Sequence, residues 1–400
     1  MIAIPLLIGI ISYLLLYFMK WRYYRLDNQT AFNEAEVLPY TSKISIVIPA
    51  SNQAQQLEQL IVRLLEQNYK GGIEIIVVLY ANTDNTLDLL KKLEYDYRNI
   101  RHTTVPGSAH FIDLRKLAIT IGIKSVRTEW FVLLDPQFIP SSTDWLTSLS
   151  SNIREDFDLI IGYENFATED TTGTTLRYTI HLNFLNLKRK HIPALGNFSN
   201  FIVRKNALDL NALYDVRSLQ FTLGSISNLL QPLFRKNAEI VCTQSQAAGM
   251  QLTSTIEIND LKTRLAVEQE LLTKTSFNKK ILKFVQPSLI YIYIIITIFY
   301  GVAATMFALT LYDALALPSF LAYFATPLSI TNNIIICTTF FLLQLCLITY
   351  PIATLRKTFK HFDIHIHIIY LLILPITLPI NELFYKIKSL FLKNKYRRKL

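Results

Sequence analysis

Long apolar segments lie at both ends of this 400-residue chain, and a mixed polar and apolar stretch lies between them. Hydrophobic residues make up 51% of the chain, and their concentration at the ends predicts membrane-spanning helices on either side of a folded domain. The formal net charge of +10 gathers beside the apolar segments, at 20–25, 279–283, 356–360 and 393–399. Basic residues in such places are typical of helix flanks next to anionic lipid, so we expect a lipid bilayer as partner and no nucleic acid.

The basic flanks also predict the topology of the chain. Residues 1–20 are a predicted N-terminal transmembrane signal anchor, since an uncharged segment is followed directly by basic residues. Segments 285–312 and 329–355 are two further predicted transmembrane helices, and they form a hairpin because no Lys or Arg lies in or between them. Segment 362–388 has basic residues on both sides and two internal prolines, which leaves a re-entrant or interfacial segment and a full span both open. The basic tail, 389–400, prefers the cytoplasmic leaflet.

The middle of the chain, residues 42–280, has a different pattern and is predicted to lie in the cytoplasm. Short apolar stretches alternate there with amphipathic ones, which is typical of a largely parallel α/β sheet. Predicted strands cover 43–50, 74–80, 130–135 and 158–162. Predicted helices cover 56–67, a segment that begins after the capping residues 82–86, and 116–126. In such folds ligands bind at the carboxyl ends of the strands.

The order of short motifs in this region resembles a family 2 glycosyltransferase of GT-A fold. The resemblance covers roughly 43–283, and the membrane segments are similar to those of membrane-bound bacterial members. Its motifs are Ser45–Ala50 with Asn52, Gln67–Tyr69, Glu74–Val78, Thr83–Thr86, Ala118–Lys124, Glu129–Trp130, Leu134–Asp135, Pro140, Trp145–Leu146, Gly162–Tyr163, Gly196, Asn200 and Arg204–Lys205. The order and spacing of these motifs are specific, although no single one is decisive.

The resemblance implies an α/β GT-A domain, one of nucleotide-diphospho-sugar transferase type, with one N-terminal and two to three C-terminal transmembrane helices. It implies a nucleotide sugar as substrate and Mg²⁺ or Mn²⁺, weakly held, as cofactor, because hard cations prefer carboxylate oxygens. Asp135 is the expected metal ligand. The residues that the resemblance assigns to nucleotide-sugar binding are Pro49, Asn52, Asp84, Asp135, Gln137, Asn200, Arg204 and Arg264.

Several positions depart from the family's chemistry. The strand-end aspartates are replaced by Leu79–Tyr80, and the D-x-D motif reads Asp135-Pro-Gln137, with an amide for the second carboxylate. The acidic residue expected as general base falls near 224–226, where the chain has Gly-Ser-Ile, which leaves Asp215 as the only candidate base. The Q-x-x-R-W motif aligns with 261–265 and retains only its arginine.

The retained residues also have structural interpretations. Asp84 can cap a helix, and Asp135 can cap the turn that follows its strand. Arg264 can be a basic residue near the inner leaflet, and Asn200 and Arg204 can hold the fold together.

Two functions from different classes therefore stay open. The chain is either a glycosyltransferase that moves sugar to a lipid-linked or membrane-proximal acceptor in polysaccharide or glycolipid synthesis, or a catalytically inactive partner of another glycosyltransferase. A transporter is disfavoured, because the membrane segments lack paired charges. The expected location is a bacterial cytoplasmic (inner) membrane.

Overall fold

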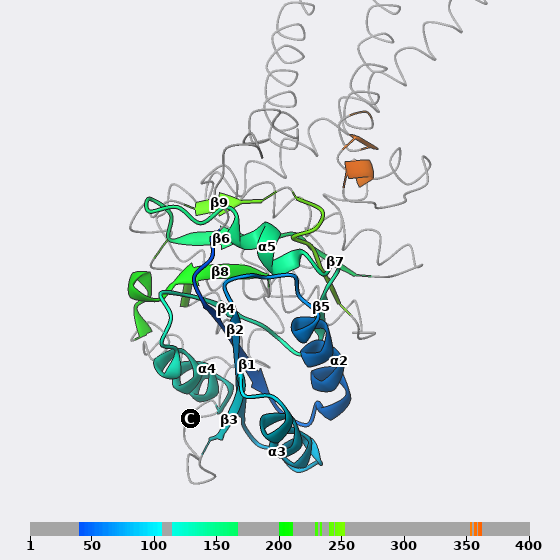
Figure 1. Cartoon of the computed structure of the whole chain (residues 1–400), viewed down its shortest axis with the longest axis vertical. Coiled ribbons are helices and arrows are strands. Elements are labelled where there is room, and N and C mark those ends of the chain that lie inside the picture. The colour runs from blue at the N-terminus through cyan, green and yellow to red at the C-terminus, as the bar shows by residue number, and fades with distance from the viewer. Residues whose placement is uncertain are drawn as a thin grey trace, which may run out of the picture. The chain divides into compact units, whose positions relative to one another are not determined.

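A computed structural model describes the middle of the chain (Figure 1). The described residues are 40–105, 114–166, 200–210, 229–230, 233, 240–243, 245–252, and a few between 353 and 361. All but those last few belong to one compact unit, Leu26–Lys274 with Phe384–Leu400. Within this described part, no helix is long and apolar enough to cross a membrane. Apart from position 353, the predicted spans and the basic tail lie outside the described residues.

A seven-stranded sheet forms the centre of the unit, in the order β3-β2-β1-β4-β8-β6-β9. Its strands are β1 (Ile44–Ala50), β2 (Ile73–Leu79), β3 (Ile100–Thr104), β4 (Trp130–Leu133), β6 (Leu159–Ile161), β8 (Phe201–Arg204) and β9 (Ile240–Cys242). The four predicted strands are present, with ends shifted by one or two residues. β3, β2, β1 and β4 are parallel, but β8 runs antiparallel to both β4 and β6. The sheet is therefore mixed but largely parallel, as the sequence pattern predicts, and β8 is the strand that runs in the opposite direction.

Helices cover both faces of the parallel half. They are α2 (Ala54–Leu65), α3 (Thr86–Asp96) and α4 (Leu114–Ser125), and a fourth, short helix, α5 (Trp145–Ser150), lies against β8. Side chains of α2 and α3 pack with Ile46 and Ile48 of β1. α4 lies on the opposite face, where a Cβ at Gly122 would stand 2.4 Å from Val47 Cγ1. Successive side chains of a strand point to opposite faces, so β1 is covered on both sides and is apolar except for Ser45.

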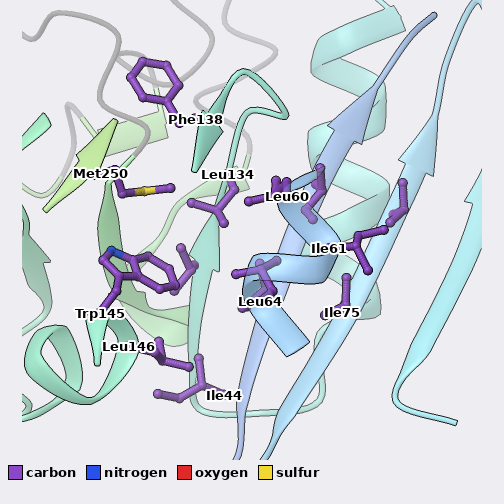
Figure 2. Packing of buried hydrophobic residues seen from close by; sticks show 14 of the residues in the cluster. Ile44, Leu60, Ile61, Leu64, Ile75, Leu134, Phe138, Trp145, Leu146 and Met250 are labelled. Atoms are coloured by element: carbon purple, nitrogen blue, oxygen red, sulfur yellow. The ribbon is translucent and has the colours of Figure 1, made fainter. Parts of the chain in front are cut away.

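One apolar core joins α2 to the sheet and to α5. Leu57, Leu60, Ile61 and Leu64 are fully buried, at the spacing of one helix face. Figure 2 shows how this cluster continues from α2 past Leu134 to Trp145 and Met250. Full burial of each such side chain contributes about 1.5–3 kcal/mol. The core therefore fixes β4, α5 and the second sheet relative to β1.

A small second sheet lies beside this core, in the order β5-β10-β7. It is built from β5 (Phe138–Pro140), β10 (Met250–Leu252) and β7 (Glu164–Phe166). β5 begins three residues after Asp135 and is antiparallel to β10. This pairing fixes the chain just after the D-x-D position.

Candidate nucleotide-sugar site at the carboxyl edge of the sheet

The strand order reverses between β1 and β4. From β1 the chain passes through α2 to β2 on one side, and from β3 it passes through α4 to β4 on the other side. Because α2 and α4 lie on opposite faces, the loops after β1 and β4 diverge. A crevice outside the carboxyl ends of the strands at such a reversal is where open α/β sheets bind ligands. We call the residues that follow β1, β2 and β4 the carboxyl edge.

Asn52 ties together the loops after β1 and β2. Its Oδ1 accepts hydrogen bonds from the backbone N–H groups of Thr83 at 2.7 Å and Asp84 at 3.2 Å. Its own φ is 51°, in the left-handed region that asparagine tolerates better than most residues. The resemblance assigns Asn52 to nucleotide-sugar binding. The structure shows a residue that shapes the loop by engaging backbone donors.

Asp84 lies one residue before Asn85, the N-cap of α3, and its side chain binds the first residue of the helix, Thr86. Asp84 Oδ1 accepts hydrogen bonds from Thr86 N at 3.0 Å and from Thr86 Oγ1 at 2.5 Å. These hydrogen bonds, led by that from the Thr86 side chain, lower the pKa of the Asp84 carboxyl below its ordinary value. The geometry therefore matches the helix-cap interpretation, and contact with a nucleoside stays a prediction.

Asp135 follows β4 and has both of its carboxylate oxygens engaged. Oδ1 accepts from the backbone N–H of Gln137 at 3.1 Å, which caps the turn. Oδ2 accepts from Arg115 Nη2 at 2.8 Å, in an ion pair whose side chains are 18% exposed for Asp135 and 36% for Arg115. A salt bridge of this length in a half-buried setting is a charge-assisted hydrogen bond.

Arg115 is the residue that sequence reasoning missed. It stands in the first turn of α4, twenty residues before its partner, and the carboxyl edge is where this helix begins. Its only sequence signal was a basic residue near the start of the helix that precedes the D-x-D strand. Gln137 lies half-buried in the same turn as Asp135.

Pro49 and Asn200 are buried parts of the scaffold. Pro49 lies inside β1, opposite Val78 of β2. Asn200 is fully buried, and its Nδ2 donates to two carbonyl oxygens, those of Tyr163 and Ala248, each at 2.8 Å. Its Oδ1 accepts from Trp145 Nε1 at 3.0 Å. These bonds join α5 to both sheets, so the geometry supports the structural interpretation of Asn200.

Arg204 is not brought to the carboxyl edge. It pairs with Trp130 at the start of β4 and stacks on that ring at 5.0 Å. Its Nη2 donates to the carbonyl oxygens of Arg154 and Glu155. Five residues of extended chain separate Trp130 from Asp135, which places Arg204 about 15 Å from the site. Arg264 and Asp215 lie outside the described residues, as do positions 224–226.

One family model matches part of the chain. Residues 45–215 match the model of Glycosyl transferase family 2. Within this segment the chain is therefore similar to family 2 glycosyltransferases. No curated protein matches the chain.

Solved structures similar to this chain share little of its sequence. A mannosyltransferase, PcManGT from Pyrobaculum calidifontis, in complex with GDP-Man and Mn2+, is 15% identical, with 98% of each chain covered and a TM-score of 0.49. Glucosyl-3-phosphoglycerate synthase from Mycobacterium tuberculosis, in complex with Mn2+, uridine-diphosphate and phosphoglyceric acid, is 15% identical over 59% of this chain and 80% of that one, with a TM-score of 0.39. S. aureus TarS 1-349 in complex with UDP-GlcNAc is 18% identical over 56% and 66%, with a TM-score of 0.36.

A divalent cation does not fit the described residues of the carboxyl edge. Among them, no group of three or more His, Cys, Asp or Glu side chains could hold a metal ion. The single carboxylate of the D-x-D position, Asp135, already binds a guanidinium through Oδ2. Gln137 offers only a neutral oxygen in place of the second carboxylate, which a hard dication would prefer.

Proposed function

We propose that this domain binds a nucleotide sugar at the carboxyl edge and transfers its sugar to a lipid-linked or membrane-proximal acceptor. The observation that carries the proposal is the position of Asp135: it lies just after β4 at the strand-order reversal, inside the segment that matches family 2. Ligands bind at this place in open α/β sheets. The Asn52 contacts support it further, because they hold the loops after β1 and β2 in one arrangement.

The membrane part of the proposal rests on the sequence. Apolar segments with basic flanks on both sides of the domain favour an acceptor held at the cytoplasmic face of a bilayer. Synthesis of a polysaccharide or glycolipid in a bacterial cytoplasmic membrane, with another glycosyltransferase as partner, fits such an acceptor. A reporter fused near Ser150 tests this arrangement. A cytoplasmic signal is expected, and a periplasmic signal would contradict it.

A second candidate function is a catalytically inactive partner of such an enzyme. It is favoured by the state of two acidic residues at the carboxyl edge. Asp84 is engaged by Thr86, and Asp135 is engaged by Arg115 and Gln137. Asp135 is thereby held through both oxygens and Asp84 through Oδ1, and general-base assistance is typically worth 10²–10⁴-fold in rate. Asp215 is the candidate base that remains.

Turnover and binding together separate the two functions. The full chain is incubated with UDP-, GDP- and dTDP-sugars, release of the nucleoside diphosphate is measured, and binding is measured by calorimetry. We expect binding of at least one donor with slow release, and loss of release in Asp215→Asn. Asp156→Asn is the matched control, because Asp156 is exposed and precedes β6, at the other end of the sheet.

Binding without any release would select the inactive partner. Release that survives Asp215→Asn would require a different base. No binding of any donor would contradict the nucleotide-sugar site itself.

A further inference from the structure

The ion pair between Arg115 and Asp135 puts a fixed positive charge at the D-x-D position. Nη2 of Arg115 lies 2.8 Å from Asp135 Oδ2, and the arginine side chain keeps 36% of its surface exposed. The pair sits at the end of β4, where the strand order of the sheet reverses. A cation is therefore already present at the place where the proposed donor would bring its diphosphate.

The charges at this position balance without a metal ion. In a D-x-D site, two carboxylates face one dication, so their charges sum to zero. Among the described residues, the carboxylate of Asp135 faces the guanidinium of Arg115, and the neutral amide of Gln137 stands where the second carboxylate would be. The site has one carboxylate fewer than a D-x-D site, and its cation has one positive charge fewer than a metal dication. These two differences offset each other. A dication added to this arrangement would meet repulsion from Arg115 with only one carboxylate to offset it.

A guanidinium is chemically suited to the task. It is always charged, and its planar set of N–H donors matches the oxygens of phosphate groups. Those donors point in several directions, so one arginine can engage a carboxylate and a phosphate together. In this geometry Asp135 is a positioning residue, because it orients the guanidinium through Oδ2 while its Oδ1 is held by the turn at Gln137.

We propose that Arg115 takes the place of the divalent cation, so that this site binds the diphosphate of a nucleoside diphosphate or its sugar without a metal ion. The proposal rests on the proposed function, since it concerns the same nucleotide-sugar site. It goes beyond that function by naming the group that recognises the diphosphate and by removing the metal from binding.

Calorimetric titration of the folded full chain with UDP and with GDP tests the proposal, once in EDTA and once in Mn²⁺. We expect affinities in the two conditions to agree within about twofold. Arg115→Met should weaken binding about tenfold or more in EDTA, as is typical when a hydrogen bond between charged groups is lost. Arg115→Lys keeps the positive charge but loses the planar set of N–H donors. Its affinity in EDTA should therefore lie between that of the unchanged chain and that of Arg115→Met.

Arg127→Met is the matched control. Arg127 is exposed and precedes β4, so it lies at the opposite end of the same strand, and its loss should leave binding unchanged. Thermal melting of each variant shows whether it is folded. If Arg115→Met does not fold, two measurements still decide whether Arg115 replaces the metal ion. They are the affinity of the unchanged chain in EDTA compared with Mn²⁺, and the affinity of Arg115→Lys.

A double variant tests the charge balance directly. Arg115→Met with Gln137→Asp restores two carboxylates and removes the guanidinium, so Mn²⁺ should now tighten UDP or GDP binding about tenfold over EDTA. Binding of the unchanged chain only with Mn²⁺, or full affinity in Arg115→Met, would overturn the role of Arg115 and leave the proposed function standing. Binding of neither nucleotide in either condition would overturn both.

Discussion

The two ends of the parallel strands carry the same kind of ion pair in different surroundings. At the amino edge, Arg101 Nε lies 3.0 Å from Glu74 Oε1, and Arg101 Nη2 donates to the carbonyl oxygen of Ser125 at 2.6 Å. At the carboxyl edge, Arg115 pairs with Asp135. α4 spans the distance between them, since Ser125 is its last residue and Arg115 is in its first turn.

The difference lies in what surrounds each pair. Glu74 is 13% exposed and also accepts a hydrogen bond from Ser45 Oγ at 2.8 Å, and Ser45 Oγ in turn accepts one from Thr128 Oγ1 at 2.9 Å. This chain of neutral donors closes the amino edge around its carboxylate. The carboxyl-edge pair is followed by a turn at a strand-order reversal. We infer that the first pair holds the sheet together, whereas the second also serves the ligand.

The largest expected effect comes from the buried layer beneath the carboxyl edge. Asn200→Ala leaves Trp145 Nε1 and the carbonyl oxygen of Ala248 without this partner in the interior, and it removes one of the two donors of the Tyr163 carbonyl, which keeps the N–H of Met250. Each buried polar group left unsatisfied costs about 1–3 kcal/mol, so the free energy of unfolding should fall by about 3–5 kcal/mol. Chemical denaturation of the full chain measures this loss.

Asn152→Ala is the matched control for Asn200. Its side-chain amide is half-buried and donates to carbonyl oxygens of α5, so a loss of about 1 kcal/mol or less is expected. Equal losses in the two variants would mean that the buried layer does not support the carboxyl edge.

At the amino edge, Glu74→Ala should lower stability without touching nucleotide binding. The change removes the partner of Arg101 and the acceptor of Ser45. Arg101 is 32% exposed, so solvent offsets part of the cost, and a loss of about 2 kcal/mol is expected. Glu58→Ala on the exposed face of α2 is the control. A change in UDP or GDP affinity larger than twofold in Glu74→Ala would break the division between the two edges.

The sequence predicted the scaffold better than the site. Apolar periodicity predicted β1, β2, β4 and the buried face of α2, because burial decides which residues a strand or helix can carry. It missed β3, Ile100–Thr104, whose residues are mostly polar. It also missed the antiparallel β8, since strand direction depends on connections that lie outside local pattern.

The site was harder to predict because motif positions do not reveal hydrogen-bond partners. Asn52 and Asn200 were assigned to the ligand by resemblance, yet their side chains bind loops and carbonyl groups of the fold. The partner of Asp135 is twenty residues away on a helix, and local sequence carries no signal for such a pair. Arg204 was assigned by its place in the motif order, whereas strand register places it at the amino edge.

A smaller effect is expected at Asn52, which ties the loop after β1 to the loop after β2. Asn52→Ala removes the acceptor for Thr83 N and Asp84 N and puts a Cβ-bearing residue without a hydrogen-bonding side chain at φ 51°. The backbone cost is about 1–2 kcal/mol. Asn52→Gly removes the same acceptor and relieves the backbone, so the difference between the two variants in denaturation isolates the strain. If both variants melt alike, the loop has no strain to relieve.

The smallest effect is the helix cap at Asp84, and pH distinguishes it from a ligand contact. Asp84→Ala should cost about 1 kcal/mol near neutral pH, as is typical for loss of a capping side chain. The pKa of Asp84 is lower in the folded protein than its ordinary value of 3.8. Its contribution is therefore present above that ordinary value and is lost as the pH falls through the folded value.

Denaturation of the unchanged chain and of Asp84→Ala should give stabilities that begin to converge below about pH 4. Asp88→Ala, in the first turn of the same helix and exposed, should show a smaller gap, because its carboxylate acts through the helix dipole and a solvent-exposed ion pair with Lys91. If the difference in free energy of unfolding between the unchanged chain and Asp84→Ala persists into acid, the hydrogen bonds from Thr86 Oγ1 and Thr86 N do not require an ionised carboxylate.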